Sequence, residues 1–123
     1  MQFRSGCPIA SGLDLFGDRW TLVVLRNAFL GCRRYNDFLR GPEGISTNIL
    51  ADRLALLERE GLVRKEPYQE HPPRHAYHLT EKGAATLPIL QAIAGWSLAH
   101  LPDRWQPREG FMEANPADFA APD

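Results

Sequence analysis

Apolar and polar positions along the first quarter of the chain recur with the period of an α-helix. Residues 9–16 form the first such stretch, and its apolar face consists of Ile9, Leu13 and Phe16. The next stretch, residues 19–31, is apolar over most of its circumference, so we expect it at the centre of a small core. Asp18 is placed to cap this helix and Gly31 to end it.

A short helix and a longer one follow, separated by a turn. The short helix is predicted by apolar residues at helical spacing, namely Tyr35, Phe38 and Leu39. The longer helix begins after Ser46, a good N-cap, and ends before Gly61. One side of it is a stripe of leucines, formed by Leu50, Leu54 and Leu57. Short helix, turn and second helix in this order are typical of a helix-turn-helix.

Residues 62–68 and 75–80 have the composition of two β-strands, and the connection between them contains Pro72, Pro73 and Arg74. A tight hairpin usually carries Asn-Gly or Asp-Gly at its tip, whereas two prolines are stiff and unsuited to a ladder. We interpret the hairpin as a wing. Its tip would hold Arg74 against the sugar-phosphate backbone or in the minor groove of DNA.

Residues 81–101 predict a long closing helix, and Pro88 should either kink it or mark its true beginning. One face carries Leu87, Leu90, Ala94 and Leu98 or Leu101, and another carries Ile89, Ile93 and Trp96. Two apolar faces predict a homodimer, since one small domain has little with which to cover both. The alternative is a fully buried core helix. The predicted dimer interface comprises Ile9, Leu13, Ile89, Ile93, Trp96 and Leu98.

These elements describe a winged helix-turn-helix, a mainly α fold with a small two-stranded β-wing (α+β), assembled as a dimer. We expect residues 1–101 to form the DNA-binding and dimerisation domain. Residues 102–123 are rich in proline and polar residues, which predicts an extended or disordered tail. Trp105 and Phe111 could nevertheless dock this tail against the domain.

Composition and charge change this picture little. The net charge of −1 gives no support to nucleic-acid binding by itself, although residues 1–101 hold 12 basic and 10 acidic residues. No apolar run reaches the roughly 18 residues of a membrane span, and residues 1–20 lack the apolar stretch of a secretory signal. We therefore expect a cytoplasmic protein without membrane contact. The two cysteines lack a CxxC spacing, so neither a disulfide framework nor a zinc site is expected.

Six segments resemble the HxlR-type branch of the MarR-like winged-helix transcriptional regulators, and they span roughly residues 7–96 in the family's order. They are CP at 7–8, DRWTLVVLRN, RRYNDFLR, GISTNILADRLALLEREGLV, PPRHAYHLTEKG and LPILQAIAGW. The resemblance implies a dimeric, DNA-binding repressor or activator that dimerises through its N- and C-terminal helices. The chain after about residue 102 has no counterpart in the common family pattern.

The helix after Ser46 is the expected recognition helix. Its predicted DNA-contacting residues are Ser46, Thr47, Asn48, Ala51, Asp52 and Arg53. Asn48 can pair with adenine N6 and N7, and Asp52 can accept a hydrogen bond from cytosine N4. The alternative is that both belong only to a solvated face. Arg53 either pairs internally, for example with Glu60, or reaches a phosphate with its long stem.

Backbone contacts are predicted for four basic residues of the wing and the preceding helix, namely Arg34, Arg64, Lys65 and Arg74. Arg34 begins the helix that crosses the DNA backbone in this geometry. Arg64 and Lys65 are otherwise ordinary surface charges of the first strand.

Cys7 is a candidate redox sensor, because it precedes a proline near a helix start, where the helix dipole favours a thiolate. Several relatives in the family that the chain resembles use a cysteine at this position to sense electrophiles or oxidants. The alternative is a small apolar residue that fills the dimer seam. Cys32 is the poorer candidate, because it follows a helix end, where the dipole disfavours a thiolate.

Catalysis has no motif to support it: the sequence contains no P-loop, dinucleotide turn, G-x-S-x-G or H-E-x-x-H. His75 and His78 point to opposite faces of a strand and prolines restrict His71, so no metal site and no cofactor are expected.

We predict a sequence-specific regulator, a repressor in the first instance, bound to double-stranded DNA as a homodimer on a pseudo-palindromic operator. A small-molecule or electrophile effector, or Cys7 modification, would control it. The alternative is a winged-helix module for protein contacts without DNA binding.

Overall fold

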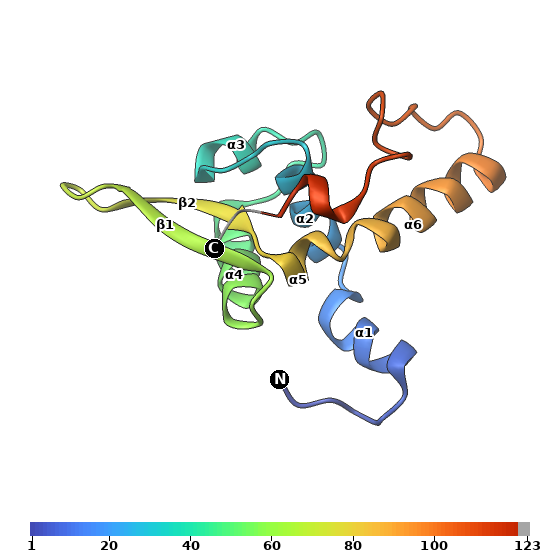
Figure 1. Ribbon diagram of the computed structural model, residues 1–123, viewed down its shortest axis with the longest axis horizontal. Coiled ribbons are helices and arrows are strands. Elements are labelled where there is room, and N and C mark those ends of the chain that lie inside the picture. The colour runs from blue at the N-terminus through green and yellow to red at the C-terminus, as the bar shows by residue number, and fades with distance from the viewer. Residues whose placement is uncertain (121–123) are drawn as a thin grey trace.

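The computed structural model describes residues 1–120, which form six α-helices, one short 3-10 helix and a two-stranded antiparallel sheet (Figure 1). The elements are α1 (Pro8–Phe16), α2 (Thr21–Phe29), α3 (Tyr35–Leu39), α4 (Thr47–Arg59), β1 (Val63–Gln69), β2 (Arg74–Leu79), α5 (Glu81–Ala84), α6 (Leu87–His100) and η1 (Pro116–Asp118). The mainly α fold with a two-stranded wing is confirmed. None of these helices has the length and apolarity that crossing a lipid bilayer demands.

Helix α2 occupies the centre of the core, as its apolar circumference predicts. Val24, Leu25 and Ala28 are buried, and the helix contacts α1, α3, α4, α6 and β2. The carboxylate of Asp18 caps it by accepting from the backbone N–H groups of Trp20 and Thr21. The helix ends before Gly31, whose φ of 104° lies in the left-handed region that favours glycine. Both predicted ends are confirmed.

The helix-turn-helix consists of α3 and α4. The leucine stripe of α4 is buried against the core at Leu50, Leu54 and Leu57, and α3 buries Phe38 beside it. Ser46 is the N-cap of α4, because its hydroxyl accepts a hydrogen bond from the Ile49 N–H at 3.2 Å. The chain turns away after α4 at Gly61, which has a φ of 78°. These sequence predictions are all confirmed.

The wing is an antiparallel hairpin whose register runs from Val63 opposite Leu79 to Gln69 opposite Arg74. Its strands lie within one residue of the predicted bounds, and the hairpin projects from the body (Figure 1). Strand β2 also forms backbone contacts with the residues that precede α3. The Tyr77 N–H donates to the Arg33 carbonyl at 2.7 Å, and Arg34 forms an isolated bridge with Ala76. These backbone contacts join the wing to the helix-turn-helix.

The predicted closing helix is two helices, α5 and α6. Pro88 lies in the first turn of α6 and marks the true beginning of that helix, which was one of the two predicted alternatives. Helix α5 is capped by Thr80, whose hydroxyl accepts from the Gly83 N–H at 3.1 Å. A Cβ atom at Gly83 would lie 1.9 Å from the Leu62 carbonyl oxygen, so only glycine permits this close approach of α5 to the wing root.

The expectation of an extended or disordered tail is wrong for residues 102–120, which fold back over α2 and α6 (Figure 1). The side-chain amide of Gln91 donates to the carbonyls of Phe111, Met112 and Ala114. The Phe119 ring packs edge-on against Phe29 at a centroid distance of 5.0 Å. Apolar contacts therefore outweigh the local preference of a proline-rich segment for an open conformation.

The predicted docking of Phe111 against the body is confirmed, whereas Trp105 leaves 80% of its surface exposed. Residues 121–123 of the predicted tail lie outside the described residues. The division of the chain at residue 101 stays a prediction.

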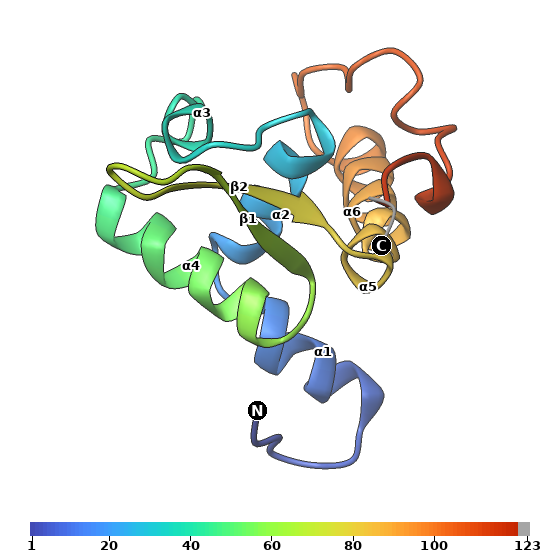
Figure 2. The same ribbon diagram turned by 60° about the vertical axis from the view of Figure 1, so that its left-hand side comes forward.

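Large apolar side chains of α1 and α6 are exposed, namely Ile9, Leu13, Ile89, Ile93 and Trp96, and Leu98 is half-buried. Helix α1 buries no residue, and α6 buries only Leu87. The alternative of a fully buried core helix is therefore wrong for α6. In Figures 1 and 2 α6 extends to the end of the molecule opposite the wing, and α1 lies at the lower edge of both views.

Candidate nucleic-acid interface

Helix α4 presents a face without protein cover along its whole length. Ser46, Thr47, Asn48, Ala51 and Asp52 are all exposed, while the leucines on the opposite side are buried. Figure 2 shows α4 and the hairpin side by side, with α6 at the other end of the molecule. The predicted recognition residues thus share one open surface beside the wing.

The N-terminus of α4 is held in place from α3. The Tyr35 hydroxyl donates to the backbone carbonyl of Thr47, which joins the two helices of the helix-turn-helix. The Ser46 cap satisfies the Ile49 N–H in the same turn. The first turn of α4 is therefore rigid, although its side chains are free to contact a ligand.

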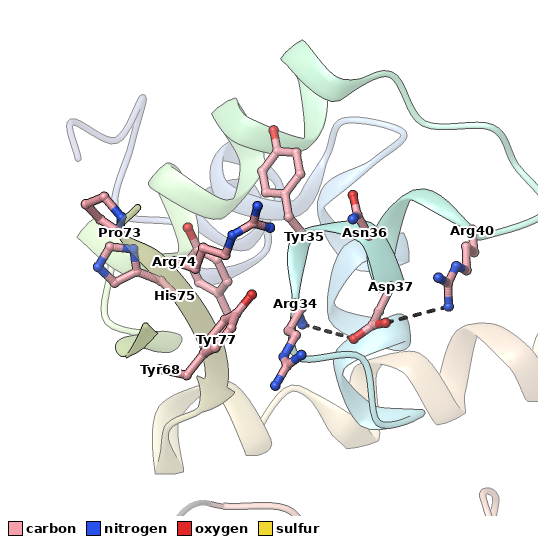
Figure 3. A pocket seen from close by; sticks show the side chains of 10 residues that line it. All are labelled: Arg34, Tyr35, Asn36, Asp37, Arg40, Tyr68, Pro73, Arg74, His75 and Tyr77. Atoms are coloured by element: carbon pink, nitrogen blue, oxygen red, sulfur yellow. Dashed lines mark hydrogen bonds and ion pairs between the residues drawn. The ribbon is translucent and has the colours of Figure 1, made fainter. Parts of the chain in front are cut away.

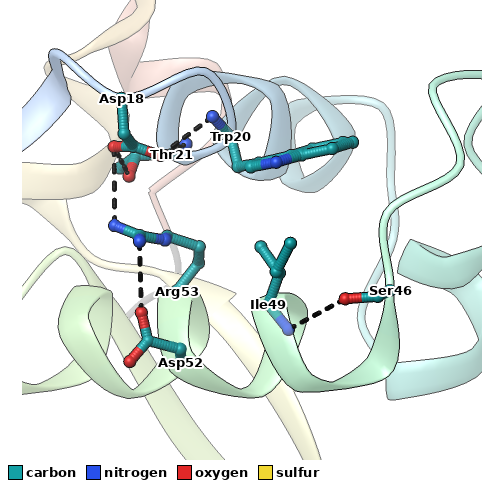
Figure 4. Close-up of polar contacts among 7 residues, drawn as sticks. All are labelled: Asp18, Trp20, Thr21, Ser46, Ile49, Asp52 and Arg53. Carbon is teal, nitrogen blue, oxygen red and sulfur yellow. Dashed lines mark hydrogen bonds and ion pairs between the residues drawn. The ribbon is translucent and has the colours of Figure 1, made fainter.

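Arg53 forms ion pairs with Asp18 and Asp52 (Figure 4). Its predicted pairing with Glu60 is wrong. One guanidinium nitrogen lies 3.6 Å from the carboxylate of Asp18, and the other lies 3.3 Å from that of Asp52. Glu60 instead lies 3.3 Å from the Met1 amino group. Arg53 therefore joins α4 to the segment that precedes α2, which agrees with the internal alternative, while a phosphate contact stays a prediction.

Asp18 carries several interactions that depend on its charge. Partial burial by itself raises the pKa of this carboxyl. Hydrogen bonds from the Thr21 hydroxyl and from the backbone N–H groups of Trp20 and Thr21, together with the Arg53 guanidinium, outweigh burial and lower the pKa below its ordinary value. Asp18 is thus ionised at neutral pH, and it caps α2 while it fixes α4.

The tip of the wing is braced by its own side chains. The Gln69 amide donates to the carbonyls of His71 and Pro72 across the turn, at 3.3 and 3.2 Å. The turn covers residues 70–73, so Arg74, predicted at the tip, is the first residue of β2. Arg74 is exposed there, on a hairpin end that its prolines and Gln69 hold in one shape.

A register shift in β1 turns Tyr68 toward α3. Pro67 pairs with His75 and Gln69 with Arg74, so Tyr68 is the extra residue of a bulge. The Arg34 guanidinium lies over the Tyr68 ring, 4.1 Å from its centroid. This contact holds an exposed arginine in a defined position between the wing and the helix-turn-helix.

A polar cleft of about 530 Å³ separates α3 from the wing (Figure 3). Its lining includes three arginines: Arg34 and Arg40 at the two ends of α3, and Arg74 on β2. Asp37 is the one acidic residue of this lining in the described part of the chain; it lies 3.9 Å from Arg40 and accepts from the Arg34 N–H. That backbone hydrogen bond is the main cause that lowers the pKa of Asp37, so this carboxyl is ionised at neutral pH. The excess of positive charge in the cleft comes from its three arginines, which outnumber this one carboxylate.

Arg64 and Lys65 are less available than predicted. The Arg64 guanidinium lies 2.7 Å from the Glu66 carboxylate, and Lys65 lies 4.0 Å from Glu58. His78 also lies within 3.4 Å of Glu66. Carboxylates therefore offset the charge of this part of the strand. By contrast, no carboxylate within residues 1–120 forms a salt bridge with Arg34 or Arg74, although Asp37 lies near Arg34.

The two cysteines occupy different environments. Cys7 is exposed and serves as the N-cap of α1, with its backbone N–H bonded to the Ser5 hydroxyl at 3.2 Å. Cys32 is half-buried, and burial, followed by the charge of Asp37, raises the pKa of its thiol. Among the described residues, no group of three or more His, Cys, Asp or Glu side chains could hold a metal ion.

Residues 15–104 match the family described as HxlR-like helix-turn-helix. The chain belongs to this family. HxlR-like relatives include the HTH-type transcriptional regulator sll1512 of Synechocystis, 40% identical over 93 residues that cover 74% of this chain and 69% of that protein. The HTH-type transcriptional regulator Rv3095 of Mycobacterium tuberculosis is 38% identical over 97 residues, or 79% of this chain. The chain spans 61% of the length of that relative.

Solved structures agree with this assignment to the HxlR-like family. A MarR-family protein from Porphyromonas gingivalis W83 has a TM-score of 0.70 and 34% identity, and the match covers 82% of this chain and 99% of that one. The redox regulator HypR in its reduced form has a TM-score of 0.71 and 30% identity, with coverages of 78% and 95%. The predicted resemblance to HxlR-type, MarR-like regulators is confirmed, and these relatives are regulators of transcription, not enzymes.

The sequence did not predict two residues that line the cleft between α3 and the wing, Arg40 and Tyr68, and we call this cleft the basic cleft from here on. Arg40 follows the last residue of α3 and resembles any exposed arginine in the sequence. Tyr68 sits at a bulge, and no local pattern indicates which neighbour a bulged side chain will meet. An aromatic residue beside a proline in a predicted strand was the only available signal.

We predict that Asp18→Ala lowers the free energy of unfolding by roughly 1–2 kcal/mol at pH 7, because it removes the cap of α2 and one partner of Arg53. Urea denaturation measures this loss. Since the folded-state pKa of Asp18 is lowered, its contribution is present above pH about 4 and disappears as the pH falls through the lowered pKa. The difference in the free energy of unfolding between Asp18→Ala and the wild type should therefore decrease below pH about 4.

Asp52→Ala is the matched control, because it removes the exposed partner of Arg53 and should cost less than about 0.5 kcal/mol. Equal losses in the two variants, or a gap that stays constant down to pH about 2, would contradict the role assigned to Asp18.

Proposed function

We propose that this protein is a transcriptional regulator that binds double-stranded DNA as a homodimer, with α4 in the major groove and the wing on the neighbouring backbone. The observation that carries the proposal is the uncovered polar face of α4 beside a braced, projecting hairpin with an exposed arginine. Membership of a helix-turn-helix family supports the same conclusion.

Base contacts come from the first turns of α4, the part of a recognition helix that meets base edges. Asn48 pairs with adenine through its amide, and Asp52 accepts from cytosine N4. Thr47 and Ala51 contact thymine methyl groups, while Ser46 remains the cap of the helix. Arg53 acts as a positioning residue, because Asp18 and Asp52 engage its guanidinium.

Backbone contacts come from the basic cleft. Arg34, Arg40 and Arg74 approach it from α3 and from the wing, so a phosphate of the duplex can neutralise charge from both elements. Arg64 and Lys65 contribute less, because Glu66 and Glu58 compete with phosphate for them. These contacts set affinity and orientation, whereas α4 sets sequence preference.

Dimerisation uses the exposed apolar faces of α1 and α6. Ile9 and Leu13 on the first helix and Ile93 and Trp96 on the second leave large side chains in water, which a second copy would cover. A two-fold axis then relates the two α4 helices, which would bind the two half-sites of a pseudo-palindromic operator. Their separation would be a whole number of turns of B-DNA, and one turn is about 34 Å. We expect repression, because a dimer that covers its operator excludes other proteins from it.

Substitution of single DNA-contacting residues tests the proposal. Arg74→Ala should weaken binding to every duplex and reduce the slope of log K against log salt by about 0.9 per protomer. Asn48→Ala should instead change the preferred base at one position of each half-site, at a cost of about 1–3 kcal/mol on the cognate sequence. Selection from a randomised duplex pool followed by fluorescence anisotropy at several salt concentrations measures both effects.

Arg104→Ala is the matched control, because this arginine is exposed in the tail and, within residues 1–120, donates only to the Pro102 carbonyl. It should bind DNA as the wild type does. Wild-type affinity and preference in both the Arg74 and Asn48 variants would refute the interface. Absence of any binding to the duplex pool would favour a protein-contact module.

The oligomeric state is tested at Trp96, whose side chain is 61% exposed on α6. Trp96→Asp should convert the dimer to a monomer, because a carboxylate in an apolar seam loses its hydration. Sedimentation equilibrium measures the mass, and circular dichroism checks that the fold survives. A wild-type chain that sediments as a monomer at micromolar concentration would contradict the dimer.

Regulation through Cys7 forms part of the proposal. The thiol is exposed at the N-terminus of α1, a helix assigned to the dimer seam, so its modification would alter how the two copies meet. A peroxide would transfer one oxygen atom to the sulfur, giving a sulfenic acid, and would itself be reduced to water. The likeness to a redox regulator, HypR, supports this assignment.

Hydrogen peroxide should therefore weaken operator binding by the wild type and by Cys32→Ser, but not by Cys7→Ser. Cys32 is spared because burial raises the pKa of its thiol, so little thiolate is present at neutral pH. Anisotropy measures binding, and mass spectrometry locates the added oxygen. A response that persists in Cys7→Ser would eliminate Cys7 as the sensor.

A further inference from the structure

A second cavity, of about 480 Å³, lies between α2, α6 and residues 105–111 of the tail. Its volume falls within the range of about 300–1,000 Å³ that is typical of small-molecule sites. The walls are largely apolar, with Leu22 and Val23 from α2, Leu90 and Ile93 from α6, and Trp105 and Phe111 from the tail. An apolar ligand of modest size would exchange water for these side chains.

The tail beside this cavity is held by hydrogen bonds and a ring contact to the helices. Three carbonyls from Phe111 to Ala114 receive hydrogen bonds from the single Gln91 amide on α6. Further along, the Phe119 ring packs on Phe29 of α2. Residues 111–119, which begin at the end of the tail wall, are thus held against both helices that form the other walls.

Two arginines line the cavity, Arg26 and Arg108, and their pairing indicates which charge a ligand should carry. Arg26 reaches the cavity, but its guanidinium makes a bidentate pair with Glu43 at 2.8 and 2.7 Å. Arg108 donates to the Leu30 carbonyl at 3.2 Å and has no acidic partner among residues 1–120. The cavity therefore joins an apolar interior to one uncompensated guanidinium, and guanidinium groups bind carboxylates and other planar anions well.

We propose that this cavity binds a small organic acid, with an aromatic or cyclic body between α2 and α6 and its anionic group on Arg108. The proposal rests on the proposed function in one respect, since it assigns the ligand as the effector. Helix α2 packs against α4, and α6 belongs to the predicted dimer seam. A ligand between them changes the separation of the two recognition helices, and with it operator affinity.

Two fluorescent probes test the site directly on the full chain. 8-Anilinonaphthalene-1-sulfonate carries an anion on an aromatic body, and N-phenyl-1-naphthylamine has the same body without the charge. Arg108→Gln should weaken the sulfonate probe about 5- to 20-fold while leaving the neutral probe within about twofold. Ala94→Phe places a ring in the cavity and should weaken both probes by at least about tenfold.

Arg104→Gln is the matched control, because Arg104 belongs to the same tail but does not line the cavity. It should bind both probes as the wild type does. Equal binding of the sulfonate probe to the wild type and Arg108→Gln would overturn the proposal, and so would unchanged binding to Ala94→Phe. Probe binding that falls as the protein self-associates would show that a second copy fills the cavity, which also overturns it.

DNA binding by the same samples separates this proposal from the function on which it rests. With a functional effector site, the sulfonate probe should shift operator affinity of the wild type at least about threefold and leave Arg108→Gln unaffected. Probe binding without any DNA binding would refute the proposed function and leave the cavity established. Normal DNA binding with no probe in the cavity would refute only the site.

Discussion

The rest of the structure depends on the burial of α2. This short helix is apolar on nearly every side, and side chains such as Val24, Leu25 and Ala28 can leave water only if several neighbours cover them. Helices α3, α4 and α6 and strand β2 supply that cover. Helix α4 must turn its leucine stripe inward for this purpose, which directs its polar face outward. The open surface of α4 is thus a consequence of how the core is filled.

Polar contacts then fix the orientation of elements that apolar burial leaves loosely determined. Apolar packing is non-directional, whereas an ion pair or a hydrogen bond specifies which atoms meet. Arg53 joins α4 to the segment before α2, Tyr35 joins α3 to α4, and Arg34 joins α3 to the wing. The three proposed sources of DNA contact are consequently one rigid unit, which limits the entropy that binding would cost.

The far side of the molecule has the opposite character. Helices α1 and α6 expose large apolar side chains, and the tail covers only part of α6. Surfaces of this kind mark contacts with other molecules. A second copy of the chain and a small ligand would both act there, some distance from the wing (Figure 2). Helix α2 contacts both α4 and α6, so it would connect the proposed ligand and dimer surfaces to the recognition helix.

The sequence alone determined α1 to α4, the two strands of the wing, the caps at Asp18 and Ser46 and the buried stripe of α4, because periodicity and capping involve residues only a few positions apart. Ser46, Gly61 and the leucines needed no knowledge of the fold. The tertiary structure decided that Arg53 meets Asp18, that Gly83 must pass the Leu62 carbonyl, and that the tail docks. These contacts join residues distant in sequence, and their partners are set by how the elements pack, which no local pattern encodes.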